Sequence, residues 1–215
     1  MARKFDAVLF DFGGVLTHSP FQAVALAGEE MGAQPGQIEA IIFGPVHEDT
    51  DHTWHRLERG EIGLAAARQA LMDEARRHGF EIDPLVVLAR MAAGRDGGVR
   101  PALVERALRI RREGLQTALV TNNVAELSVA WRSMVPVDEL FDVVIDSSAV
   151  GVRKPDPAIF RLALEALDGV APGRAVFLDD LEENVRAAER LGLHGVLVGE
   201  DDDAVIAALD RLLAA

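Results

Sequence analysis

Short apolar runs alternate with helical segments from about residue 97 to the end of the 215-residue chain. The runs typical of strands are 117–120, 141–145, 175–178 and 195–198, and 7–10 forms another near the start. Helical patterns follow at 101–113, 124–134, 157–167, 181–191 and 203–213. Strands that are apolar along their whole length are typical of a parallel sheet covered on both faces. We therefore predict an α/β fold, a Rossmann-like doubly wound parallel sheet.

Residues 17–96 have a different pattern, with several helical stretches and little sign of strands. The run 41–43 is ambiguous between a strand and a helix. Glycine-rich 94–98 and the stretch 17–20 are typical of linkers. We expect a core of residues 1–16 and 97–215, with 17–96 inserted as a small helical bundle, or cap. In open α/β sheets ligands bind at the carboxyl ends of the strands, where such a cap would lie.

The composition excludes several classes of function. There is no cysteine, so disulfides, thiolate nucleophiles and cysteine-ligated metals are excluded. The net charge of −13 argues against binding to nucleic acid or to anionic membranes. No apolar stretch approaches the length of a membrane span, and the start leads directly into a strand rather than a secretory signal. We expect a cytoplasmic monomer or homodimer.

Chemically active side chains follow four of the predicted strands. These side chains are Asp11, Thr121 with Asn122, Lys154, and Asp179 with Asp180. A parallel sheet would bring them to one edge although they are up to about 170 residues apart in sequence. This convergence predicts a functional site at that edge.

Several residues near these strand ends also have a local explanation. Asp180 and Glu183 match a helix capping box, and Thr121 could simply turn the chain toward the next helix. Asp156 before Pro157 fits an N-cap, and there we favour the capping interpretation. Capping explains neither Asp11 nor Asp179. A chain without a functional site here would also require all the local explanations to hold at once.

The set is suited to phosphoryl transfer. A carboxylate such as Asp11 can attack phosphorus and form an aspartyl phosphate. Repulsion between the two anions then requires a cation, and carboxylate oxygens suit Mg²⁺. Lys154 would neutralise further charge, and Thr121 and Asn122 would donate hydrogen bonds to phosphoryl oxygens.

With these residues the chain resembles the haloacid dehalogenase-like hydrolase superfamily, most of whose members are magnesium-dependent phosphatases. The ordered motifs are LFDFGGVL, LVTNN, GVRKPDPAIF and VFLDDLEENVRAAERLG, and the likeness covers nearly the whole length. The chain is similar in particular to the branch that includes the N-terminal phosphatase domain of soluble epoxide hydrolases. A small phosphorylated metabolite is the substrate that this resemblance implies.

The resemblance also implies roles for individual residues. Asp11 would be the nucleophile and a metal ligand, the carbonyl of Gly13 a second ligand, and Asp180 an acidic ligand with Asp179 beside it. The positions that match phosphate binding are Thr121, Asn122 and Lys154.

Gly13 departs from the family pattern, because most phosphatases of this superfamily carry an acid–base aspartate there. General acid–base assistance contributes about 10²–10⁴-fold to a rate. Three hypotheses follow: the enzyme favours substrates with good leaving groups, another group such as His18 replaces the aspartate, or the protein binds phosphate with little or no turnover.

Two further points stay open at this stage. A zinc site at His47, His52 and His55 is conceivable but is not the interpretation that we favour, because their spacing matches no trusted ligand pattern. The rival functions are a 2-haloacid dehalogenase, a receiver domain, and a noncatalytic phosphate- or metal-binding protein. A dehalogenase would leave the paired acids unexplained, and a receiver domain has a different motif order and no cap.

Overall fold

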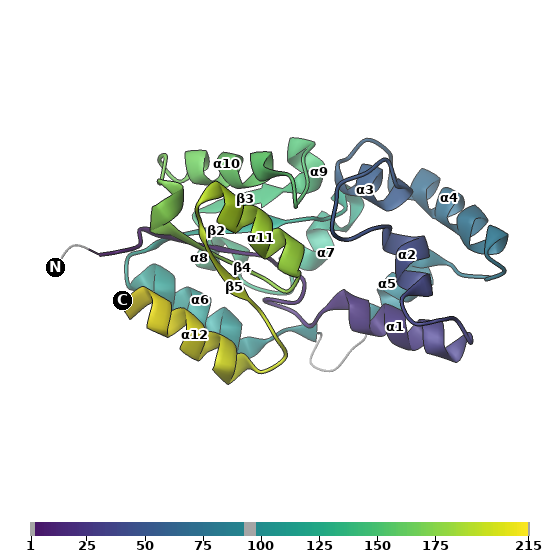
Figure 1. The fold of residues 1–215 in the computed structure, drawn as a ribbon, viewed down its shortest axis with the longest axis horizontal. Coiled ribbons are helices and arrows are strands. Elements are labelled where there is room, and N and C mark those ends of the chain that lie inside the picture. The colour runs from purple at the N-terminus through teal and green to yellow at the C-terminus, as the bar shows by residue number, and fades with distance from the viewer. Residues whose placement is uncertain (1–2, 93–97, 215) are drawn as a thin grey trace.

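The core is a parallel sheet with the first strand in its middle (Figure 1). The computed structural model describes residues 3–92 and 98–214. Within them the sheet has five strands in the order β3-β2-β1-β4-β5, and all neighbours pair in parallel. The strands are β1 (Ala7–Phe10), β2 (Gln116–Thr121), β3 (Val143–Asp146), β4 (Ala175–Asp179) and β5 (His194–Leu197). The predicted α/β fold is confirmed.

Helices cover both faces of this sheet, which explains why the strands are apolar along their length. Val8 and Phe10 of β1 point to one face, and Ala7 and Leu9 point to the other. All four are at most 1% exposed. The first face packs against α6 (Pro101–Arg112), α8 (Val137–Leu140) and α12 (Asp202–Ala214). The second face packs against α10 (Pro157–Ala166) and α11 (Glu182–Leu191).

Five helices between β1 and α6 form a separate group, here called the helical segment. They are α1 (Pro20–Glu30), α2 (Gln37–Phe43), α3 (Thr53–Glu58), α4 (Leu64–Arg77) and α5 (Pro84–Ala92). The segment has its own apolar cluster, which Val124 joins from the core. It lies at the opposite end of the molecule from the end of α12 (Figure 1). The strand alternative for residues 41–43 is wrong, because they belong to α2.

The chain enters and leaves the helical segment at one place. Thr17 forms an isolated antiparallel bridge with Val99. The amide of His18 donates to the carbonyl of Gly98 at 2.6 Å, and the amide of Arg100 donates to the carbonyl of Leu16 at 2.8 Å. The two connections therefore run side by side. Most of the expected return linker, residues 94–97, lies outside the described residues.

Short elements complete the core. They are η2 (Ala125–Leu127), α7 (Ser128–Arg132), α9 (Ser147–Val150) and η3 (Pro172–Arg174). The single helix predicted for 124–134 is thus divided into a 3₁₀ turn and a short α-helix. Asp156 is the N-cap of α10 and accepts a hydrogen bond from the amide of Ala158, as predicted.

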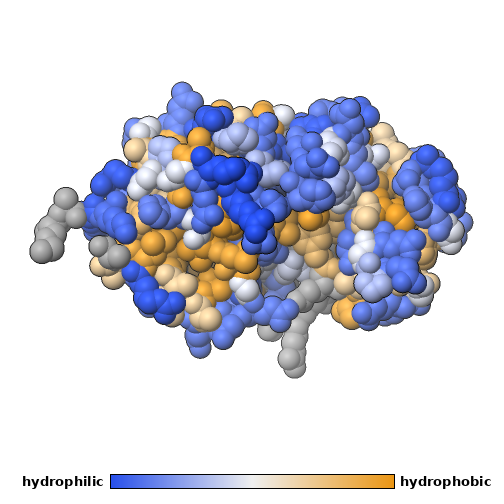
Figure 2. All heavy atoms as spheres, viewed as in Figure 1, coloured by the Kyte–Doolittle hydropathy of each residue, from blue (hydrophilic) through white to orange (hydrophobic). Residues whose placement is uncertain are grey.

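The face of the molecule drawn in Figure 2 is polar over much of its area. Figure 2 shows hydrophilic atoms over most of one face, with hydrophobic atoms visible mainly between the helices. Among the described residues, no helix has both the length and the apolar character to cross a membrane.

Candidate active site

Asp11 directly follows β1, at the carboxyl edge of the sheet. Its amide continues the ladder by donating to the carbonyl of Leu178 at 2.9 Å, and the residue is 9% exposed. In the loop that follows, Gly14 has φ +78°, and a Cβ there would lie 2.1 Å from Cγ of Asp180. Only glycine combines this backbone conformation with such a close approach. The loop is therefore shaped to bring Asp11 and Asp180 together.

Three carboxylates and one ammonium group form the centre of the site. Asp11, Asp179 and Asp180 each place an oxygen within 4.8 Å of the others. Lys154 is 1% exposed, and its Nζ lies 2.7 Å from Oδ1 of Asp11 and 2.7 Å from Oδ2 of Asp179. The convergence predicted from sequence thus occurs for residues that follow β1, β3 and β4.

Burial shifts the titration of these groups. It raises the pKa of Asp11 to about 7, helped by Asp179 and Asp180 and opposed by Lys154. Burial and the charge of Asp179 raise the pKa of Asp180 to about 6. Burial opposes the charge of Lys154, but Asp11 and Asp179 outweigh it and raise the pKa of its ammonium group. The cluster thus holds more negative charge than the single lysine compensates.

Asp179 is the most connected acid of the site, although the sequence pattern assigns it no role. It is 0% exposed. Besides the contact with Lys154, its two oxygens accept from Nδ2 of Asn184 at 3.0 and 3.1 Å, and Oδ1 accepts from the amide of Leu181 at 2.8 Å. Adjacent paired acids after an apolar strand are the only sequence signal for this residue.

The capping-box interpretation of Asp180 is wrong. The N-cap of α11 is Leu181, and it makes no side-chain cap. Oδ2 of Asp180 accepts instead from Oγ of Ser19 at 2.7 Å, across 161 residues of sequence. The carboxylate of Asp180 therefore faces the nucleophile loop and the start of α1.

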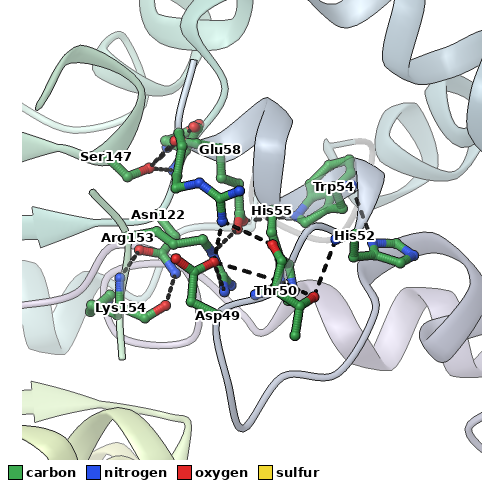
Figure 3. A network of polar contacts seen from close by, with 12 residues as sticks. Asp49, Thr50, His52, Trp54, His55, Glu58, Asn122, Ser147, Arg153 and Lys154 are labelled. Carbon is green, nitrogen blue, oxygen red and sulfur yellow. Dashed lines mark hydrogen bonds and ion pairs between the residues drawn. The ribbon is translucent and has the colours of Figure 1, made fainter. Parts of the chain in front are cut away.

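Thr121 and Asn122 lie at the end of β2, next to Lys154. Thr121 is 1% exposed and pairs in register with Asp146 of β3. Oδ1 of Asn122 accepts from the amide of Lys154 at 2.8 Å, and its Nδ2 donates to the carbonyl of Lys154 at 3.0 Å (Figure 3). Asn122 therefore holds the backbone of the lysine, and its contact with a phosphoryl group stays a prediction.

Arg100 supports the nucleophile loop, and no pattern in the sequence indicates it. The residue is 4% exposed at the start of α6. Its Nη1 donates to the carbonyl of Gly14, its Nη2 to the carbonyl of Gly199 at 2.6 Å, and its Nε to Asp202 at 2.8 Å. One guanidinium group thus ties the loop after β1 to the loop after β5.

The remaining residues singled out in the sequence are Gly13, His18 and the histidines of residues 47–55. Gly13 is half-buried beside Asp11, whereas His18 is exposed. Among the described residues, only Asp11, Asp179 and Asp180 form a group of acids or histidines suited to a metal. The histidines of residues 47–55 are not brought together in such a group. The acidic group consists of hard oxygen donors with excess negative charge, so it suits a hard divalent cation.

Comparison with known proteins shows the family to which the chain is related. A model of the haloacid dehalogenase-like hydrolases matches residues 5–192. Mouse acyl-CoA dehydrogenase family member 10 is 35% identical over 211 residues, which are 94% of this chain and 19% of that protein. Rat bifunctional epoxide hydrolase 2 is 33% identical over 217 residues, 91% of this chain and 37% of that protein. The chain thus spans only a minor part of these two relatives.

A third relative matches along its length. Sesquiterpene phosphatase astK of Aspergillus oryzae is 30% identical over 199 residues, which are 91% of each chain. Its name, like that of other relatives, contains the word phosphatase.

Solved structures have the same fold. A predicted hydrolase of this family from Porphyromonas gingivalis has a TM-score of 0.65 at 26% identity and covers 99% of each chain. A family enzyme from Bacteroides thetaiotaomicron, in complex with magnesium and inorganic phosphate, has a TM-score of 0.63 at 21% identity, covering 92% of this chain and 96% of its own. The resemblance inferred from the motifs, including the likeness to epoxide hydrolases, is confirmed. The chain belongs to the haloacid dehalogenase-like hydrolases.

Proposed function

We propose that the protein is a magnesium-dependent phosphatase that hydrolyses a small phosphomonoester through an aspartyl phosphate on Asp11. The observation that carries this proposal is the group of three carboxylates around one buried lysine at the carboxyl edge of the sheet. Relatives that are named phosphatases, and a structural neighbour that holds magnesium with inorganic phosphate, support it.

Asp11 is the attacking group in the proposed mechanism. A carboxylate oxygen forms a bond to phosphorus while the bond from phosphorus to the leaving oxygen breaks, and that oxygen takes up a proton. Water then attacks the phosphoryl group, which releases inorganic phosphate and restores the carboxylate. Bound at Asp11, Asp180 and the carbonyl of Gly13, Mg²⁺ supplies positive charge that offsets repulsion between substrate and nucleophile.

The remaining residues hold the phosphoryl oxygens. Lys154 lies 2.7 Å from Asp11, so its ammonium group can also neutralise a phosphoryl group placed on that carboxylate. Thr121 is the last residue of β2, at the same edge of the sheet, and is suited to donate its hydroxyl hydrogen. Nδ2 of Asn122 uses one hydrogen on the carbonyl of Lys154, and its second hydrogen is assigned to the substrate.

The helical segment, within residues 17–96, is proposed to act as a cap that selects the substrate. Two of its contacts with the core lie beside the site, one between Ser19 and Asp180 and one between Glu58 and Arg153. Arg59, which directly follows α3, is bound by Asp49 and Glu61. The specificity of the enzyme is therefore not assigned to Arg59.

Dehalogenation is the rival activity within this family. Displacement of halide from carbon would also use Asp11, and a dehalogenase crystal structure has a TM-score of 0.66 at 19% identity. A neutral carbon–halogen bond creates no repulsion with a carboxylate, so that reaction gives the clustered Asp179 and Asp180 no role. The phosphatase makes Asp11 the nucleophile and Asp180 a metal ligand, and Asp179 holds Lys154 beside them.

The first test is hydrolysis of p-nitrophenyl phosphate with and without Mg²⁺, using Asp11→Asn as the control. We expect hydrolysis that requires both the metal and the carboxylate. If neither this substrate nor a panel of phosphorylated metabolites is hydrolysed in this way, the phosphatase assignment fails and a noncatalytic binding protein is favoured. Release of halide from 2-haloacids without Mg²⁺ would favour the dehalogenase.

The second test concerns Gly13, which leaves the loop without its usual acid. A sugar 1-phosphate or an acyl phosphate needs less protonation of its leaving group than an alkyl phosphate does. We expect faster turnover of the first two than of a simple alkyl phosphate, and a faster alkyl reaction in Gly13→Asp. Equal rates on all three substrates would contradict the preference. If Gly13→Asp hydrolyses the alkyl phosphate no faster than the wild type, the idea that missing acid catalysis limits the rate is contradicted.

A further inference from the structure

A buried ion pair joins the helical segment to the core beside the catalytic lysine. Glu58, at the end of α3, is 7% exposed, and Arg153, in the loop after α9, is 5% exposed. Nε of Arg153 lies 2.8 Å from Oε2 of Glu58, across 95 residues of sequence (Figure 3). Trp54 donates its indole N–H to Oε1 of Glu58 at 2.8 Å. Both oxygens of this carboxylate are therefore engaged.

The two surfaces around this pair are closely packed. Oγ of Ser147 donates to the carbonyl of Glu58 at 2.6 Å. A Cβ at Gly60 would lie 2.5 Å from the carbonyl oxygen of Ser148, so the backbone of the helical segment touches that of α9. Nη1 of Arg153 also lies 3.4 Å from Oδ1 of Asp49. Water therefore has little access to the pair, and Glu58 is the nearer of the two acids that face Arg153.

Arg153 is peptide-bonded to Lys154, so the chain at these two residues is held at three points. The guanidinium group of Arg153 binds Glu58, and Asn122 binds the amide and the carbonyl of Lys154. The Nζ of Lys154 binds Asp11 and Asp179. Of these three anchors, only the guanidinium group reaches the helical segment.

We propose that Arg153, held by Glu58, is a positioning residue that couples docking of the helical segment to the placement of Lys154 at Asp11. Loss of Arg153 leaves the carboxylate of Glu58 buried without its counter-ion, and loss of Glu58 leaves Arg153 only the longer contact with Asp49, so the segment and the loop shift together. This coupling rests on the proposed phosphatase function, in which Lys154 neutralises charge during phosphoryl transfer. A lysine misplaced by about 1 Å can reduce a rate about 10²-fold.

A simpler role would be to hold the helical segment on the core without affecting Lys154. Glu126 offers a matched comparison, because its Oε1 accepts from the amide of Leu64 at 2.7 Å. This contact also joins the core to the helical segment, but Glu126 is exposed and adjoins no residue of the site. A purely mechanical role predicts similar kinetic effects from loss of either contact.

The test compares Glu58→Gln, Arg153→Gln, the conservative Glu58→Asp and the control Glu126→Ala on p-nitrophenyl phosphate with Mg²⁺. We expect kcat to fall about tenfold or more in the first two variants, with little change in KM. Glu58→Asp should recover part of this loss, because it keeps the charge. Glu126→Ala should keep the wild-type kcat. Equal effects of Glu58→Gln and Glu126→Ala, confined to KM, would overturn the proposal.

Hydrogen exchange gives a readout that does not depend on activity. The amide of Lys154 is protected by Asn122, so its exchange should accelerate in Glu58→Gln and Arg153→Gln but not in Glu126→Ala, with circular dichroism confirming that each variant is folded. Unchanged exchange in both folded variants would overturn the coupling. If wild-type protein hydrolyses nothing, the proposed function fails, and the exchange measurement still decides whether the pair controls the loop. If one Gln variant does not fold, the other, with Glu58→Asp, gives the same decision.

Discussion

Gly14 shows how strongly a single residue constrains the site. Its left-handed φ of +78° and its contact with Asp180 leave no room for a side chain. The two glycines after Asp11 predict a tight turn, which explains the backbone but not the acid packed against it. That contact joins residues 14 and 180, so no local pattern could indicate it.

We predict that Gly14→Ala abolishes magnesium-dependent hydrolysis, because the new methyl group would displace the carboxylate of Asp180. Gly79→Ala is the matched control, since Gly79 has φ +84° and a Cβ added there would meet nothing within 4 Å. Both variants should lose about 1–2 kcal/mol of unfolding free energy from backbone strain. Assays and urea denaturation separate the two effects, and an active Gly14→Ala would contradict the steric argument.

A helix or strand could be predicted where the sequence pattern that indicates it is local. The strands β1 and β4 could be predicted because both faces are buried and nearly every position is apolar, and β2 because its centre, Ala118–Val120, is apolar. Helix α2 could have been recognised, since Ile38, Ile41 and Ile42 recur at helical spacing and all are buried. The division of the helix after β2 could not be predicted, because it depends on Val124, which is buried against the helical segment far away in sequence.

Arg100 belongs to the same class of nonlocal features, and it ties two loops rather than stabilising one helix. We predict that Arg100→Met lowers the unfolding free energy by about 2–4 kcal/mol, because carbonyl groups and Asp202 lose a buried partner. It should also lower kcat about tenfold, since the loop that carries Asp11 is released.

Arg106→Met provides the comparison for that prediction. Arg106 lies on the same helix, is 6% exposed, and binds Asp210 at 2.7 Å and Glu113 at 3.3 Å. Its loss should destabilise the fold while kcat stays at the wild-type value. Chemical denaturation and steady-state kinetics on both variants are the measurements. Equal kcat in the two variants would show that Arg100 has no special effect on the loop.

For the molecule as a whole, stability depends on pH through a histidine that is buried in the helical segment. His55 is 0% exposed, and its Nδ1 accepts from the amide of Thr50 at 3.0 Å. Burial, with the charges of Arg153, His52 and Arg59, lowers the pKa of His55 to about 3. The folded protein therefore keeps this ring neutral where the unfolded chain, with a pKa near 6.5, would protonate it.

The sign of the effect follows from proton binding. Below pH 6.5 the unfolded state binds a proton that the folded state excludes, so stability is present above that pH and falls toward pH 3. Between about pH 7.5 and 5 we predict that His55 accounts for about 2 kcal/mol of lost unfolding free energy. His55→Asn keeps an acceptor for the amide of Thr50. Between these two pH values its unfolding free energy should therefore fall by about 2 kcal/mol less than that of the wild type. Urea denaturation at both pH values checks this, and parallel losses would contradict a neutral buried ring.

The order of the strands also bears on how the protein is made. β1 leaves the ribosome first, yet it lies in the middle of the sheet, and its partners β2 and β4 end at Thr121 and Asp179. The nascent chain therefore carries Asp11 without its neighbouring strands while the helical segment is synthesised. Asp179 and Asp180 arrive after most of the protein exists, so a truncated product that ends before them lacks two of the three acids.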